Sequence, residues 1–205
     1  MVWVHRAFAA VLAACVFVAI AGQASATTVN FDDLSNGDVV GATYSGLGVT
    51  FVDAVVTNTY GARSGATSPN GVTHVNGFEV SQTDPIEATF SAAVTSVSIA
   101  AFDVGSGGVI LKAFDAAIGG TLVDSVQASG GGDNVILTVS DPNILRVEFS
   151  RLTDVAGDGI AFDNFIFEPA VSPVPLPTAL PLFLAALASL GFFGWRKGRK
   201  DAAIA

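Results

Sequence analysis

The stretch that decides the fold class runs Leu-Arg-Val-Glu-Phe-Ser-Arg and occupies residues 145–151. Apolar side chains at Leu145, Val147 and Phe149 alternate with polar ones at the positions between them. This period of two is that of a β-strand with one buried face, because successive side chains point to opposite sides of a sheet. The segment Ser96–Ala101 has the same alternation, which predicts a second strand of this kind.

Short runs of β-forming residues separated by turn clusters extend this pattern over residues 27–170. Only the two ends of the chain have convincing helical character, so the sequence predicts an all-β fold, a single antiparallel β-sandwich domain. Asp141-Pro142-Asn143 is expected to be a turn. Residues 58–84 are the least regular part, and Arg63–Gly71 within them is expected to be a long surface loop, either a binding site or an exposed insertion. The expected strands are Thr27–Asp32, Val49–Thr57, Phe78–Ser81, Ile86–Phe90, Val94–Phe102, Val109–Phe114, Thr121–Ala128, Val135–Val139, Leu145–Arg151 and Ile160–Phe167.

Residues 1–26 are typical of a secretory signal peptide that forms a short helix. A weakly basic start precedes an apolar run, and the small residues before Thr27 predict cleavage by signal peptidase between Ala26 and Thr27. The alternative is lipidation at Cys15, which ends a lipobox-like Leu-Ala-Ala-Cys, although the apolar run continues beyond it. Cys15 is the sole cysteine, so cleavage before Thr27 leaves a domain without disulfides or thiol chemistry.

The C-terminal region has three parts in order. A linker of residues 171–178 contains two prolines, residues 179–195 form an uncharged apolar segment, and residues 196–205 form a basic tail. As a helix the apolar segment is slightly shorter than a hydrocarbon core of about 30 Å, a mismatch that a transmembrane helix tolerates. Basic residues directly after such a helix stay on the cytoplasmic side, which places the preceding domain outside the membrane. The basic stop-transfer residues are Arg196, Lys197, Arg199 and Lys200.

Val174, Pro175, Leu176 and Pro177, followed by the apolar segment and the basic cluster, resemble the PEP-CTERM family of bacterial sorting tails, in its VPLPA variant. The resemblance implies that an exosortase-type transpeptidase recognises the tetrapeptide and sorts the protein. The destination it implies is the cell surface or extracellular matrix, after an initial stage of inner-membrane anchoring. Thr178 stands where the variant usually has alanine, and residues 201–205 extend past the usual end of such tails.

The charge of the part outside the membrane is strongly negative. Residues 27–173 hold 17 acidic and four basic side chains, a formal charge of −13 against −9 for the whole chain. Such a surface repels phosphate backbones, which excludes nucleic acid as an expected partner. It suits divalent cations and solubility.

Three short motifs in the domain resemble the jelly-roll carbohydrate-binding modules that often precede such tails. They are Asn30–Leu34, Leu111–Ala116 and Ile160–Phe165. Those modules commonly hold a structural Ca²⁺ between their first and last strands. Calcium prefers oxygen ligands, and a carboxylate in a buried strand such as Asp163 is costly unless it is compensated. We therefore expect a calcium site of Asp163 with Asp32 or Asp33, helped by Asp103 or Asp158; hydrogen bonds from backbone amides or pairing with Arg151 are the alternatives.

No catalytic constellation accompanies the one histidine of the domain, His74, which is expected to be a hydrogen-bonded loop residue. The domain contains no tryptophan, so only Tyr44, Tyr60 and exposed phenylalanines are available to stack on sugar rings. The sequence thus predicts a non-enzymatic surface or matrix protein with a structural or adhesive role. A carbohydrate-binding module that takes up extracellular polysaccharide is the alternative, and a secreted hydrolase is the third.

Overall fold

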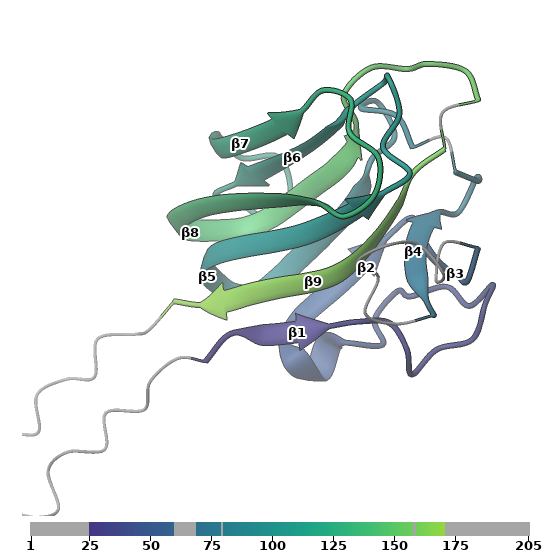
Figure 1. Cartoon of the computed structure of the whole chain (residues 1–205). Coiled ribbons are helices and arrows are strands. Elements are labelled where there is room, and N and C mark those ends of the chain that lie inside the picture. Colours follow the sequence, from purple (N-terminus) through teal and green to yellow (C-terminus); the bar gives the residue numbers. More distant parts are fainter. Residues whose placement is uncertain (1–24, 60–68, 79, 158, 171–205) are drawn as a thin grey trace, which may run out of the picture. The chain divides into compact units, whose positions relative to one another are not determined.

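Two strands of 17 residues, β5 (Ile86–Phe102) and β8 (Val135–Arg151), lie side by side in antiparallel register through the middle of the domain (Figure 1). The sequence predicts each as two separate strands. The structure joins them, and register shifts between Thr89 and Val94 and between Val94 and Ser96 absorb the irregular residues. The prediction of a turn at residues 141–143 is therefore wrong, because this segment is part of β8 and lies opposite the register shifts of β5.

This computed structural model describes residues 25–59, 69–78, 80–157 and 159–170. Within these residues every regular element is a strand, apart from the 3₁₀ turn η1 (Ser45–Leu47), and all strand pairs are antiparallel. The all-β prediction is confirmed at this level. The remaining strands are β1 (Thr27–Val29), β2 (Val49–Val52), β3 (Ala54–Thr57), β4 (Gly71–His74), β6 (Val109–Phe114), β7 (Leu122–Ala128) and β9 (Ala161–Pro169).

The strands follow the order β3-β4-β9-β5-β8-β6-β7, with β1 added to β9 and β2 added to β5. The two ends of β5 have different neighbours. Its first residues pair with β2 and with the last part of β8, whereas its last residues pair with β9 and with the first part of β8. The long strands therefore connect one group of strands, β2, β6 and β7, to another, β1, β3, β4 and β9.

Phenylalanine rings fill the space between these two groups. Phe51 of β2 lies 5.1 Å from Phe165 of β9, and Phe149 of β8 lies 4.8 Å from Phe162 of β9, both edge to face. Phe90 of β5 is stacked on Phe165 at 6.2 Å. These rings are all at most 3 % exposed, so apolar burial across the two groups of strands stabilises the domain.

A bulge in β9 explains how Phe162 and Phe165 both reach the core although they are three positions apart, which in a regular strand would place them on opposite faces. Asn164 has a positive φ of 52°, and the register between β5 and β9 shifts between Ser98 and Ala100. Asparagine tolerates this left-handed conformation better than most residues. A regular strand would have placed Asp163 and Phe165 on one face, as the sequence suggests; the bulge separates them.

Other predicted elements differ in detail. The run 49–57 is divided at Asp53, whose φ of 59° breaks the strand into β2 and β3. No strand is assigned to the described residues of 78–81, and β4 lies in the region expected to be irregular. Within the described residues no helix has the length and hydropathy needed to cross a membrane. Most of the signal peptide, the sorting motif, the transmembrane segment and the basic tail lie outside the described residues.

The phenylalanine core predicts the effect of truncating its central ring. Phe165→Ala removes a ring that lies within 6.2 Å of Phe51, Phe90, Phe149 and Phe167, so it leaves a cavity in the core. We expect the free energy of unfolding, measured by urea denaturation, to fall by about 3–5 kcal/mol. The control Ile118→Ala changes a side chain that is 93 % exposed, and it should change the free energy of unfolding by less than about 0.5 kcal/mol. Equal effects of the two variants would contradict this core.

Candidate functional site

Two cross-strand rows of side chains lie next to each other over β5, β8 and β6. Glu87 is opposite Glu148, which is opposite Lys112 on its other side. In the adjacent row Thr89, Arg146 and Phe114 are in the same relation. Residues two apart on a strand share a face, so both rows belong to the face opposite the phenylalanine core. We call these six residues the outer polar face.

Arg146 lies at the centre of the outer polar face. Its side chain is only 7 % exposed and is ion-paired with Glu148 and with Glu87, the latter at 3.3 Å between Nη1 and Oε1. Nη2 donates to the carbonyl of Gly119 at 3.0 Å, and the guanidinium lies 4.2 Å from the Phe114 ring centroid. A buried charge is stable only with such compensation. The carboxylates and the ring are consequently held in fixed positions.

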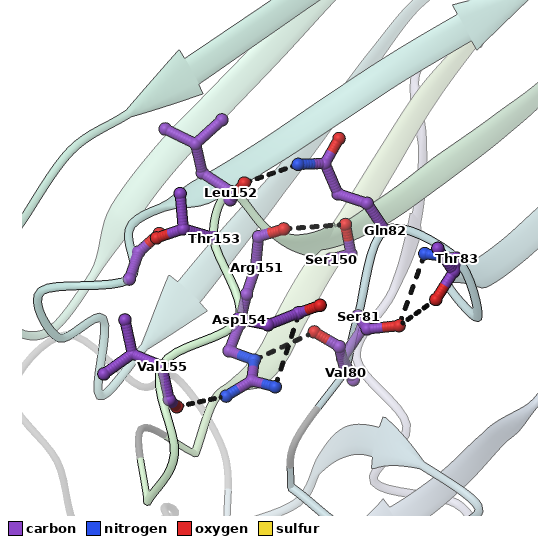
Figure 2. A network of polar contacts seen from close by, with 11 residues as sticks. Val80, Ser81, Gln82, Thr83, Ser150, Arg151, Leu152, Thr153, Asp154 and Val155 are labelled. Carbon is purple, nitrogen blue, oxygen red and sulfur yellow. Dashed lines mark hydrogen bonds and ion pairs between the residues drawn. The ribbon is translucent and has the colours of Figure 1, made fainter.

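A second network joins the end of β8 to the loop before β5 and the loop after β8 (Figure 2). Arg151 at the end of β8 donates to the carbonyl oxygens of Val80 at 3.1 Å and Val155 at 2.6 Å. Gln82 donates to the carbonyl of Leu152 and accepts a 2.9 Å hydrogen bond from Lys112 Nζ. The loops before β5 and after β8 thus hold the Lys112 ammonium group at one edge of the face.

The three residues of the predicted calcium site occupy different surroundings. Asp163 is 2 % exposed, and its Oδ1 accepts a 2.6 Å hydrogen bond from the amide of Asn164. Asp32 accepts from Asn30 Nδ2 at 2.9 Å, and Asp33 accepts from the Tyr44 hydroxyl. The backbone-amide contact matches one of the alternatives considered for Asp163. The calcium site stays a prediction. If adding calcium to the purified domain leaves its melting temperature unchanged, the site does not exist.

Tyr44 is a core residue. It is 7 % exposed, and its ring packs edge to face on Phe31 at 5.8 Å and on Phe51 at 6.3 Å. Burial, together with the hydrogen bond to Asp33 and the charges of Asp33 and Asp32, holds the pKa of the Tyr44 phenol far above its ordinary value. Tyr44 is therefore not available to stack on a sugar ring, and Tyr60 lies outside the described residues.

His74 is not a loop residue, because it ends β4 and is 2 % exposed. Sequence reasoning also missed the outer polar face. The alternation in residues 145–151 did place Arg146 and Glu148 together, but Glu87 and Lys112 belong to other strands. Which strands neighbour each other is decided by long-range pairing, and no local sequence pattern marks that pairing.

The fold is thus an antiparallel all-β domain that presents a polar face on one side. No family model and no curated protein matches the chain. Among solved structures, the K2 cleaved adhesin domain of Lys-gingipain is similar with a TM-score of 0.45 and 13 % identity, over 70 % of this chain and 99 % of that domain.

Two carbohydrate-binding structures are also similar. A family 29 carbohydrate-binding module has a TM-score of 0.39 and 15 % identity, over 77 % of this chain and 98 % of the module. The CBM22-1–GH10 portion of Clostridium thermocellum xylanase 10B has a TM-score of 0.42 and 12 % identity, over 77 % of this chain and 30 % of the xylanase chain.

The environment of Tyr44 predicts a pH dependence of stability. In the unfolded chain the phenol ionises near pH ~10, whereas in the folded domain it keeps its proton to higher pH. The stability linked to this proton is therefore fully present below pH ~10 and is lost as the pH rises toward the folded pKa. Urea unfolding between about pH 9 and about pH 11 should show a steeper loss for the wild type than for Tyr44→Phe. Parallel losses would contradict the buried hydrogen-bonded phenol.

Proposed function

We propose that the domain binds carbohydrate of the extracellular polymer through the outer polar face. The observation that carries this proposal is the row of Glu87, Glu148 and Lys112 beside the Arg146–Phe114 pair. Sugar hydroxyls need a set of hydrogen-bond donors and acceptors, and charged groups make the stronger of such bonds. Because Arg146 and Gln82 already hold these side chains, little conformational entropy is lost when a ligand binds.

Binding without catalysis suits these carboxylates better than acid–base chemistry. Both Glu87 and Glu148 are ion-paired with Arg146 through an Oε1 atom. A catalytic pair would need both carboxyl groups to face the scissile bond, whereas here both are engaged by the same guanidinium. The jelly-roll form of the β-sandwich belongs to this proposal as well.

A structural or adhesive role in the same polymer is the second candidate. Its support is the surplus of 17 acidic over four basic residues in 27–173, which favours hydration and the bridging of divalent cations. This role needs no defined sugar site. Sugar binding that is lost when single residues are changed would therefore support the carbohydrate-binding role over the structural one.

Export and sorting complete the proposal. Signal peptidase cleavage between Ala26 and Thr27 would leave β1 whole, since this strand begins at Thr27. Thr27 pairs with Phe167 near the end of β9, so the two ends of the domain lie next to each other (Figure 1). The segment 171–205 would then anchor the domain by that end until an exosortase-type enzyme acts near 174–177.

Removing single charges from the outer polar face tests the carbohydrate proposal. Glu87→Gln and Lys112→Gln keep the side-chain size but remove a charged hydrogen-bonding group. On a glycan array and in affinity electrophoresis with extracellular polysaccharide, each should weaken binding about tenfold or more. Glu168→Gln, an exposed position on β9, is the matched control and should bind as the wild type does. Failure of the wild type to bind any glycan, or equal binding by all variants, would refute the proposal.

Intact-mass analysis of the protein recovered from cell surface and medium tests the sorting proposal. A polypeptide that begins at Thr27 and ends near residues 174–177 is expected. A mass that still includes residues 180–205 would show that the tail remains as an anchor and is not processed.

A further inference from the structure

Three metal-ligating side chains converge at the ends of strands on the side of β3 and β4. Asp53 lies at the junction of β2 and β3, His74 ends β4, and Asp84 precedes β5. One ligand atom from each lies within 4.8 Å of the others, and His74 Nε2 is 3.4 Å from Asp84 Oδ2. Among the described residues this is the one group of three such side chains. The outer polar face shares none of its residues.

Backbone contacts fix the three positions. Ala54 pairs with His74 in the β3–β4 register, and the amide of Val75 donates to the carbonyl of Asp53 at 3.0 Å. Asp53 has a φ of 59°, a conformation that aspartate and asparagine tolerate better than most residues. The amide of Asp84 donates to the Ser81 carbonyl at 3.3 Å, and Asn76 Nδ2 lies 3.4 Å from Asp84 Oδ2.

The histidine of this group has an unsatisfied atom. His74 is 2 % exposed, and its Nδ1 accepts a 3.1 Å hydrogen bond from the amide of Asn76. Nε2, on the side of the carboxylates, has no hydrogen-bond partner of acceptable geometry. A buried polar atom without a partner is costly, on the order of 1–3 kcal/mol, and a well-formed fold rarely retains one without a reason.

We propose that Asp53, His74 and Asp84 bind a divalent transition-metal ion, of which Zn²⁺ fits best. In a tetrahedral zinc site, bonds of about 2.0–2.2 Å place ligand atoms roughly 3.4 Å apart. This separation matches the observed distance from Nε2 to Oδ2. An imidazole ligand favours zinc over calcium or magnesium, and the two carboxylates balance the charge of the ion. Three protein ligands leave the fourth position for water.

Metal binding requires a change of tautomer. While Nδ1 accepts from Asn76, the single proton of the neutral ring is on Nε2. Coordination by Nε2 moves this proton to Nδ1, which can then no longer accept the Asn76 amide. Asn76 is exposed, so water replaces the lost acceptor. The bound ion would connect the β2–β3 junction, β4 and the segment before β5, and would thereby stabilise the domain.

A melting-temperature titration of the EDTA-treated full-length protein with ZnCl₂ tests the proposal. At a zinc concentration about 100 times the dissociation constant, the melting temperature of the wild type should rise by roughly 5–10 °C. Asp84→Asn should weaken zinc binding about tenfold or more, because it removes a direct ligand. Asp53→Asn keeps the backbone conformation and should do the same. CaCl₂ should not raise the melting temperature of the wild type through this site.

Two controls and a second measurement complete the test. His5→Gln removes the other histidine of the chain, and Asp141→Asn removes a carboxylate outside the group; both should respond to zinc as the wild type does. In ¹⁵N NMR spectra of the wild type, zinc should shift the His74 ring nitrogens and the Asn76 amide together. No zinc response in the wild type, or an undiminished response in Asp53→Asn and Asp84→Asn, would overturn the proposal.

Discussion

The antiparallel pairing of β5 with β8 is the interaction on which the rest of the domain depends. These strands are in register at both ends, Ala88 opposite Val147 and Ile99 opposite Leu137, with the irregular residues between. Because each strand continues through the irregularity, one pair of strands supports both groups of the remaining strands. Every other strand except β7, β1, β3 and β4 pairs directly with β5 or β8.

The positions of the functional groups follow from this pairing. The register between β5, β8 and β6 brings Glu87, Glu148 and Lys112 into one row and fixes Arg146 beside Phe114. On the inner side, the same strands contribute Phe90 and Phe149 to a core that β9 completes with Phe162 and Phe165. A buried apolar layer and an outer layer held by charge pairs thus stabilise the same backbone from both faces.

Local pattern was sufficient to predict most strands and insufficient to predict how they assemble. The alternation in residues 96–101 and 145–151 was visible, since side-chain periodicity is a property of the segment alone. The continuity of β5 and β8 was not visible, because Pro142 and the small residues at 91–93 have the composition of turns, and they lie where the register between the two long strands shifts. The bulge at Asn164 depends on tertiary packing in the same way.

The candidate sites show the same division. Aspartates 32, 33 and 163 were chosen because two lie near the first strand and one lies in the last, and β1 does pair with β9. The group of Asp53, His74 and Asp84 combines residues from three separate segments, so no spacing in the sequence marks it. His74 has no recognisable motif around it, and only its burial and the absence of a hydrogen bond at its Nε2 distinguish it from a solvent-exposed loop histidine.

The measurement that tests this account most directly is a set of cross-strand NOEs in the isotopically labelled protein. Contacts between Ala88 and Val147 and between Ile99 and Leu137 should both be present, together with one between Glu148 and Lys112. If only one end of β5 contacts β8, the long strands are interrupted. The outer polar face and the core would then not share a continuous backbone, and the account would be wrong.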